Sequence, residues 1–258
     1  MLTRRVPRTG EPTRAPDHLI VEEPLEIRLD DRLVGTTMRT PGHDFELAAG
    51  LCFTDGLLAE APVQGVRYCT TGSAVDTEFN VVTVETGGAA PAPVPRLTTA
   101  SSSCGLCGSQ TLDELADRLD PLPPNEAWPV EVLSAVPDAV RARQELFDRT
   151  GAVHAAAAFD RDGEVLVVRE DIGRHNAVDK VVGRLLLDGA LPATDRGLFV
   201  SGRASFEMVQ KAWAAGFEAI VAVSAPSALA VRTASTARLL LAGFARPDAL
   251  NLYVEPGR

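Results

Sequence analysis

Residues 197–223, GLFVSGRASFEMVQKAWAAGFEAIVAV, contain a strand, a helix and a second strand in one short stretch. The apolar runs at 197–200 and 219–223 have the length of buried strands. Between them, residues 205–215 carry apolar side chains at helical spacing. Buried strands that alternate with amphipathic helices are typical of a parallel sheet covered by helices. This stretch therefore predicts an α/β fold.

The same alternation extends across residues 131–258. We expect a helix from about Asp138 to Arg149, then a hairpin, then further strands and helices. The predicted strands are 152–159, 165–168, 197–200, 219–223 and 250–254, and the predicted helices are 174–187, 205–215 and 227–241. The sequence thus predicts a C-terminal α/β domain with a mixed, largely parallel sheet and flanking helices.

The N-terminal part has a different pattern. Residues 1–18 are rich in arginine and proline, so we expect a flexible leader. Residues 19–100 predict a smaller β-rich α+β domain, whose single helix is capped by Asp44. Its strands are expected at 25–29, 33–38, 66–70 and 79–85. Residues 101–130 are expected to hold a cysteine loop, a helix at 109–119 and a proline-rich connector.

The cysteine loop, SSSCGLCG at 101–108, carries two thiols two residues apart. Such a pair can bind a metal, form a disulfide, or receive and pass on a sulfur atom. Cys107 precedes a predicted helix N-terminus, which favours its thiolate, and Cys104 lies farther from that helix. A four-ligand zinc site would need Cys52 and Cys69, which lie far apart in sequence, so no metal site is predicted.

The overall composition limits the classes of partner. A formal net charge of −10 argues against broad nucleic-acid binding, although a small anion needs only a few local donors. No apolar run is long enough to cross a bilayer, and the N-terminus lacks the apolar core of a signal peptide. We therefore expect a cytoplasmic protein with reduced cysteines and no membrane contact.

The predicted strand ends are unusually polar. In α/β sheets ligands bind beyond the carboxyl ends of the strands, and three strand-to-helix turns there could bind a phosphate or another anion. The candidate binding residues are Ser201, Gly202, Arg203, Ser224, Ala225, Pro226 and Ser227. A second polar group beside them comprises Glu170, Asp171, Arg174, His175, Asn176, Asp179 and Lys180.

Plainer interpretations of the same residues remain open. Ser205 and Ser227 can be helix N-caps, and the polar group at 170–180 can be a solvated helix face. His154, in an alanine-rich strand, can be a hydrogen-bonded core histidine.

Four segments carry a resemblance to a known family. They are 151–157, REDIGRHNAVDK at 169–180, 201–211 and 222–227. Together they closely resemble the formate dehydrogenase accessory sulfurtransferases of the FdhD/NarQ family, from about residue 22 to residue 253. Cys104 and Cys107 lie where that family carries its sulfur-handling cysteines.

The resemblance implies a specific function. Members of the family accept sulfur from a cysteine desulfurase as a cysteine persulfide. They pass it to the molybdenum or tungsten centre of a bis(molybdopterin guanine dinucleotide) cofactor before that cofactor enters formate dehydrogenase. They are homodimers with a cytidine deaminase-like C-terminal part, and they bind the GDP-like portion of the cofactor. The family pattern adds Gly243, Phe244, Ala245, Arg246, Pro247 and Asp248 to the cofactor site.

We therefore predict a sulfurtransferase with Cys107 as carrier and Cys104 as its partner, with the reverse order left open. Cys104 could hold the persulfide in relay, or could release its sulfur wastefully by forming a disulfide. Deaminase chemistry is not expected, because the His-x-Glu and Pro-Cys-x-x-Cys motifs of zinc deaminases are absent from the sequence. The alternatives are a chaperone that only holds the cofactor and a dithiol oxidoreductase.

Overall fold

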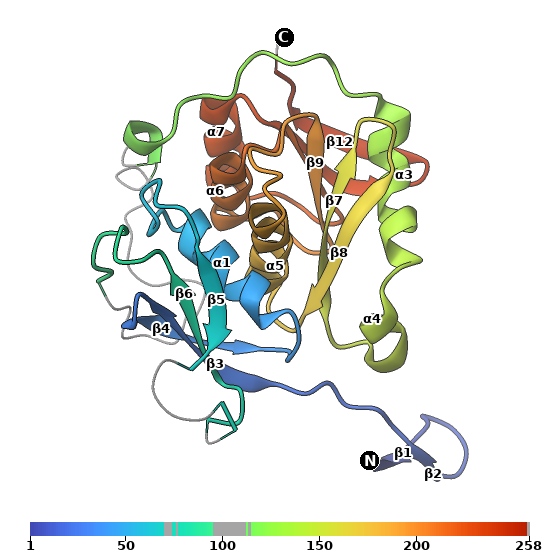
Figure 1. The fold of residues 1–258 in the computed structure, drawn as a ribbon. Helices are drawn as coiled ribbons and strands as arrows, with labels where there is room; N and C mark the ends of the chain where they lie inside the picture. Colours follow the sequence, from blue (N-terminus) through green and yellow to red (C-terminus); the bar gives the residue numbers. More distant parts are fainter. Residues whose placement is uncertain (70–73, 76, 95–111, 113–114, 257–258) are drawn as a thin grey trace.

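The computed structural model describes residues 1–69, 74, 75, 77–94, 112 and 115–256, and its larger unit is built on a six-stranded sheet (Figure 1). The strands are β7 (His154–Asp160), β8 (Val165–Asp171), β9 (Arg196–Val200), β10 (Ala219–Ala222), β11 (Leu240–Arg246) and β12 (Ala249–Val254). Their order is β12-β11-β10-β9-β7-β8. Only β9, β10 and β11 are mutually parallel, because antiparallel hairpins flank them on both sides. The sheet is therefore mixed, as predicted, but not largely parallel.

Helices cover both faces of this sheet. One face carries α5 (Arg174–Leu187), α6 (Phe206–Ala215) and α7 (Ala228–Ala237), and the other carries α3 (Val130–Arg141), which leads to α4 (Glu145–Thr150). Apolar side chains from both layers meet the strands in two buried clusters, one on each face. No helix in the described ranges is long and apolar enough to cross a membrane.

The smaller unit is a four-stranded sheet with one helix. Its strands are β3 (Glu23–Leu29), β4 (Arg32–Arg39), β5 (Gly65–Tyr68) and β6 (Val81–Glu85), in the order β4-β3-β6-β5. Helix α1 (Asp44–Thr54) lies between this sheet and α5 (Figure 1). The predicted hairpin, helix and two further strands are therefore all present.

The arginine-rich leader forms a hairpin of its own, contrary to the prediction. β1 (Leu2–Arg5) pairs with β2 (Thr13–Pro16), and the Thr3 hydroxyl donates to the Ala15 carbonyl at 3.1 Å. Gly10 lies in the connecting loop with φ of 104°, and glycine adopts such a positive φ easily. Backbone pairing needs few apolar side chains, which is why the composition did not reveal this hairpin.

Strand β11 was not predicted, because the apolar spacing indicated a single helix from 227 to 241. The helix ends at Ala237, and Arg238 follows in the left-handed region with φ of 55°. The apolar run that begins at Leu239 is compatible with either a helix or a strand, and its length does not distinguish them. The structure makes it an inner strand.

One predicted helix start and one predicted helix cap were also wrong. The helix expected to begin near Asp138 begins at Val130, continues through Pro137, and is separate from α4. Asp44 is the first residue of α1 but does not cap it, because both carboxylate oxygens bind Arg39 at 3.0 and 3.1 Å. Tertiary partners outweighed the local signals in the second case.

Candidate functional site

The carboxyl ends of β9, β10 and β11 meet at one edge of the six-stranded sheet, together with the start of β7. The segments that follow β9 and β10 are joined through their backbones. The Ser224 amide donates to the Gly202 carbonyl at 3.2 Å, and the Ser227 amide donates to the Ala204 carbonyl at 3.0 Å. The predicted turns 201–205 and 224–227 therefore lie side by side, and we call this place the strand-end site.

A third segment, residues 243–246 at the end of β11, joins these turns. The Phe244 amide donates to the Ser224 carbonyl at 3.3 Å. The Arg246 guanidinium donates to the Val223 carbonyl at 2.8 Å. The structure thus places residues 243–246, at the end of a strand that was not predicted, beside these two turns.

The backbone of this third segment is irregular. Gly243 lies so close to its neighbour that a Cβ there would be 3.1 Å from Cδ of Pro226. Phe244 has φ of 52° at a break in the β11–β12 register, and its side chain is 46% exposed. Pro247 and Asp248 form the exposed turn that leads into β12. An aromatic ring therefore stands at the rim of the strand-end site.

His154 lies at the inner side of the strand-end site. The Ser201 hydroxyl accepts a hydrogen bond from the Ala155 amide at 2.9 Å and lies 3.4 Å from Nδ1 of His154. That hydroxyl can donate its proton to Nδ1, and the neutral ring then carries its hydrogen on Nε2. A Cβ on Gly202 would lie 3.6 Å from the His154 ring and 3.9 Å from Cδ of Arg174. These four residues therefore surround the same small volume.

The electrostatics favour the neutral form of His154. Burial lowers its pKa, and the positive charges of Arg174 and His175 lower it further. A neutral imidazole at neutral pH can donate a hydrogen bond to an anion without a change in its own charge.

His175 and Glu207 connect α5 to α6 beside this site. Nε2 of His175 contacts the Glu207 carboxylate as an ion pair. The hydrogen bond with His175 lowers the pKa of Glu207, and this effect outweighs burial. The pair holds the first turns of the two helices together.

Two buried hydrogen-bond donors at the site lack acceptors among the residues that the structure describes. Arg174 Nε and the Ser205 hydroxyl are buried with no hydrogen-bond partner in the described part of the chain. Ser205 is the N-cap residue of α6 but makes no capping hydrogen bond, whereas Ser227 caps α7 by accepting from the Ala230 amide at 3.1 Å. Arg203, in the turn at 201–205, is exposed. Donors that lack acceptors are costly when buried, so this set fits an anionic ligand such as a phosphate.

A metal site is not formed by the described residues. Within those ranges, no group of three or more His, Cys, Asp or Glu side chains could hold a metal ion. The donors at the strand-end site, one of which is the neutral His154, can bind an anion.

The model of the FdhD/NarQ family matches residues 20–258 of this sequence. The chain belongs to the FdhD/NarQ family.

Relatives and a solved structure agree with that assignment. The sulfur carrier protein FdhD of Streptomyces avermitilis is 48% identical, over 97% of this chain and 92% of its own length. Its namesake from Corynebacterium efficiens is 44% identical, over 92% of this chain and 89% of its own length. The crystal structure of a protein from Desulfotalea psychrophila, described as a formate dehydrogenase accessory protein, has a TM-score of 0.79 and 25% identity, covering 100% of this chain and 98% of that one.

In this FdhD/NarQ family member, part of the predicted polar group faces away from the strand-end site. Nζ of Lys180 lies 2.7 Å from the Asp171 carboxylate and donates to the Thr40 carbonyl at 2.9 Å. Asp171 also accepts from the Thr40 amide at 3.1 Å and from the side-chain amide of Asn176 at 3.1 Å. All three side chains are buried in the contact between α5 and the end of β4. Their contacts hold the two units of the protein together.

Asp179 likewise lies in a buried contact. It accepts from the Thr54 hydroxyl at 2.8 Å and from Nζ of Lys211 at 2.8 Å. Burial would lower the pKa of Lys211, but the charges of Asp179 and Asp55 outweigh burial and raise it. This cluster joins α1, α5 and α6.

Glu170 serves a third structural contact. Its carboxylate accepts from the amides of Leu146 and Phe147, at 2.8 and 2.9 Å, at the start of α4. Of the seven residues predicted as a polar group, Arg174 and His175 have side chains at the strand-end site, and Asp171 pairs with His154 across β7 and β8. The sequence could not show which side of the strand-to-helix turn the others face.

Glu207 and Lys211 received no role from the sequence, although both lie in the segment 201–211 that carries the resemblance. They lie one helical turn apart on α6, which starts at a strand end. Two ionisable residues on one face of such a helix are the signal that could have identified them.

Cys104 and Cys107, the predicted sulfur carriers, lie outside the described residues. The chain that follows them is placed by Arg118, which donates to the Asp55 carbonyl at 2.9 Å. The Trp213 indole donates to the Asp120 carbonyl at 2.8 Å, and Leu115 is buried. The segment after the cysteine loop therefore packs against α1 and α6.

Proposed function

We propose that this protein is a sulfurtransferase for a metal cofactor. It would accept sulfur from a cysteine desulfurase as a persulfide on Cys107, with Cys104 as partner. It would then pass the sulfur to the molybdenum or tungsten centre of a bis(molybdopterin guanine dinucleotide) cofactor, on its way to formate dehydrogenase. The convergence of unpaired donors at the strand-end site, in a chain whose relatives are named sulfur carrier proteins, supports this proposal most directly.

The strand-end site would bind the GDP-like portion of the cofactor, which is the substrate here. Arg203, Arg174 Nε and the Ser205 hydroxyl would donate to phosphate oxygens. Neutral His154 would add a hydrogen bond at the inner side. The exposed ring of Phe244, at the rim, offers a face for a planar base.

The transfer chemistry needs a nucleophile for each of its two steps and a source of two electrons. The Cys107 thiolate attacks the outer sulfur of the donor persulfide, the donor S–S bond breaks, and the desulfurase cysteine leaves as a thiolate. In the second step the Cys104 thiolate attacks Sγ of Cys107, so that a disulfide forms and the outer sulfur leaves as sulfide for the metal. Oxidation of the two cysteines to a disulfide supplies the two electrons that reduce the outer sulfur to sulfide, and a cellular thiol would then reduce the disulfide and restore both cysteines.

Chain length allows the cysteines to serve this site. A chain spans at most about 3.6 Å per residue, so Cys107 lies within about 30 Å of Leu115. Arg118 and Lys211 both contact the end of α1 at Asp55, and Glu207 lies one turn from Lys211 along α6. The anchor of the cysteine segment and the strand-end site therefore share α6 as a common support.

Intact-protein mass spectrometry tests the transfer. Wild type, Cys104→Ser and Cys107→Ser would each be incubated with a cysteine desulfurase and cysteine. We expect a gain of one sulfur atom that reductant removes and that disappears only in Cys107→Ser. A gain that disappears only in Cys104→Ser would reverse the order of the two thiols. No gain in any form, with the cofactor still bound, would leave the chaperone alternative.

Calorimetric titration with GDP tests the binding half separately. Loss of a charge-assisted hydrogen bond to phosphate should weaken GDP binding about tenfold or more in Arg203→Gln. Arg32→Gln, on the distant β3–β4 turn, is the matched control and should bind GDP as wild type does. Equal affinities in all three proteins would remove the strand-end site from the proposal. The same proposal includes a cytoplasmic location and a homodimer, and sedimentation of the purified protein would check the dimer.

A further inference from the structure

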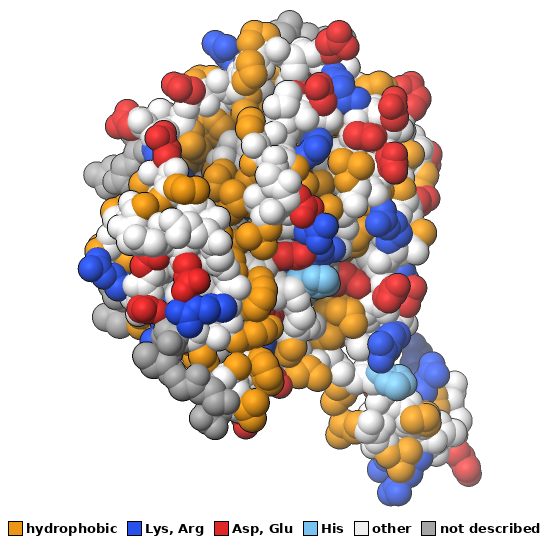
Figure 2. All heavy atoms as spheres, viewed as in Figure 1, with side chains coloured by type: hydrophobic (Ala, Val, Ile, Leu, Met, Phe, Trp, Pro, Cys, Tyr) orange, Lys and Arg blue, Asp and Glu red, His pale blue; other side chains and the backbone are white. Residues whose placement is uncertain are grey.

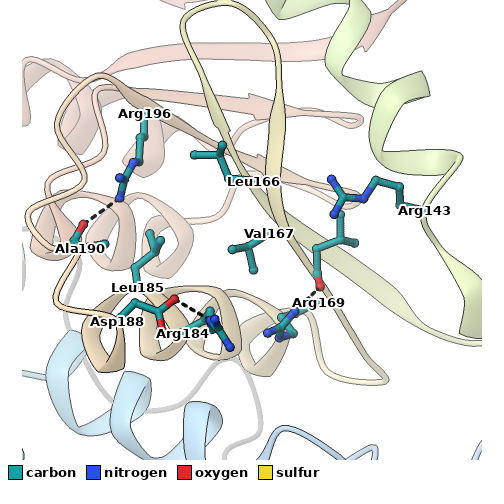
Figure 3. A pocket seen from close by; sticks show the side chains of 10 residues that line it. Arg143, Leu166, Val167, Arg169, Arg184, Leu185, Asp188, Ala190 and Arg196 are labelled. Atoms are coloured by element: carbon teal, nitrogen blue, oxygen red, sulfur yellow. Dashed lines mark hydrogen bonds and ion pairs between the residues drawn. The ribbon is translucent and has the colours of Figure 1, made fainter.

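A second hollow, distant from the strand-end site, lies along β8 at the edge of the six-stranded sheet (Figure 3). Its volume is about 480 Å³, within the usual range for small-ligand sites. Arg196 at the start of β9 lies at the opposite end of that strand from Ser201. Helix α5 runs from the strand-end site towards this hollow, and its residues from Arg174 to Leu187 span about 20 Å. We call it the β8 pocket.

The walls of the β8 pocket combine two kinds of side chain. Leu166, Val167 and Leu185 supply an apolar surface, and Leu166 is 37% exposed although it lies in the sheet. Four arginines, Arg143, Arg169, Arg184 and Arg196, surround that surface, and Asp188 is the one carboxylate of the described lining. Apolar and basic side chains lie next to one another over β8 and α5 in the space-filling view (Figure 2).

The four arginines differ in how far their charge is balanced. Arg169 donates to the Glu46 carboxylate at 2.8 Å, and Arg184 donates to Asp188 at 2.6 Å. Arg143 and Arg196 bind carbonyl oxygens of Val165 and Ala190 and have no carboxylate partner in the described part of the chain. Two guanidinium groups therefore keep an unbalanced charge and spare donors.

This arrangement exceeds what protection of an edge strand requires. Charged side chains commonly guard such strands, and Arg143 does occupy a carbonyl of β8. That role needs neither a hollow nor an exposed apolar wall. In a chain of net charge −10, a local cluster of arginines around an apolar surface is instead suited to an amphipathic anion.

We propose that the β8 pocket binds a small organic phosphate whose apolar or aromatic body packs on Leu166, Val167 and Leu185. The phosphate is held by Arg196, whose planar guanidinium group matches phosphate oxygens. Arg143 lies across the apolar surface from Arg196 and adds positive charge to the opposite side of the pocket (Figure 3). This site is independent of the strand-end site and of sulfur transfer.

Methyl NMR of the full-length protein, titrated with phenyl phosphate, tests the proposal. We expect saturable shifts of the Leu166, Val167 and Leu185 methyl signals, since an aromatic ring on them changes their local field. Arg196→Gln should raise the dissociation constant about tenfold, and Arg143→Gln, which removes only a charge on the opposite side of the pocket, should raise it less. Arg32→Gln should leave the dissociation constant unchanged. Arg196→Lys keeps a charge but loses the planar guanidinium group, so its dissociation constant should lie between those of wild type and Arg196→Gln.

Three outcomes would overturn the proposal. The first is the absence of shifts at these methyls with millimolar phenyl phosphate. The second is a set of shifts confined to Val223 beside the strand-end site, which would place phosphate binding there alone. The third is a response to an acetylated tetraglutamate peptide but not to phenyl phosphate, which would assign the pocket to an acidic protein segment. Phenol and inorganic phosphate, titrated separately, measure how much the apolar ring and the charged group each contribute to the affinity for phenyl phosphate.

Discussion

His154 lies where the start of β7 meets the end of β9, close to Arg174 and His175. Burial lowers its pKa, and these two cations add to the effect, while Asp171 opposes it. A histidine whose folded-state pKa lies below the unfolded value of about 6.5 binds a proton more readily after unfolding. Protonation below that pH therefore favours the unfolded chain.

We expect His154→Gln to reduce the loss of stability on acidification. Urea unfolding at about pH 7.5 and about pH 5.5 would show a larger decrease in the free energy of unfolding for wild type than for the variant. Glu207 has a lowered pKa, so the stability that its charge contributes is lost only below its ordinary pKa of 4.5. It therefore does not affect the comparison between about pH 7.5 and about pH 5.5. His18→Gln, in the exposed leader, is the control. Equal decreases in wild type and His154→Gln would contradict the prediction.

Lys211 illustrates the opposite case, a buried charge that is fully paired. Lys211→Met leaves Asp179 buried beside Asp55 without its cation, which should cost about 3–5 kcal/mol of unfolding free energy. The double variant Lys211→Met/Asp179→Leu removes the pair and should recover most of that loss. Arg184→Gln, which breaks an exposed pair with Asp188, should cost at most about 1 kcal/mol. Urea titration measures all three, and additive losses in the double variant would refute the coupling.

At the scale of elements, the contact between α1 and α5 depends on two glycines. A Cβ on Gly50 would overlap the Asp179 carbonyl, and a Cβ on Gly183 would overlap the Glu46 carbonyl. The helices thus approach until backbone meets backbone. Neither glycine has a positive φ, so close approach is the reason that a side chain is excluded.

Gly50→Ala and Gly183→Ala should therefore each destabilise the protein by about 2 kcal/mol or more, because backbone atoms must move apart. Gly202→Ala is the matched control, since its Cβ would meet the nearest atoms at an ordinary 3.6 Å. Thermal unfolding followed by circular dichroism would rank the three. A wild-type melting temperature in either helix variant would show that the helices can separate at no cost.

The same elements show what the sequence could and could not predict. Helix α5 has the predicted bounds, since its apolar spacing and polar start agree. Strand β11 was hidden because its apolar run joins that of α7 without a glycine or proline between them. The polar residues at 170–180 were recognised as unusual, but Asp171, Asp179 and Lys180 serve a contact with β4, α1 and α6. No local pattern reveals which distant element will cover a helix face.

At the scale of the whole molecule, the two units are joined by buried polar groups and not by a linker alone. Thr40 binds Asp171 and Lys180, and the Asn176 amide donates to the Met38 carbonyl at 2.8 Å. Each of these partners would be left buried and unpaired if the units separated, which costs free energy on both sides. The predicted domains at 19–100 and 131–258 therefore differ in sequence pattern, but the buried contacts between them couple their stabilities.

We predict that the two sheets unfold in one cooperative transition. Trp128 and Trp213 are both buried in the larger unit, so tryptophan fluorescence reports on that unit. Hydrogen exchange of the β3 and β6 amides reports on the smaller one. Coincident urea midpoints are expected in wild type, because the buried contacts at Thr40 link the two equilibria. Lys180→Met, which leaves Asp171 buried without its cation, should lower both midpoints together. An earlier midpoint for β3 and β6 in wild type would show instead that the smaller unit unfolds by itself.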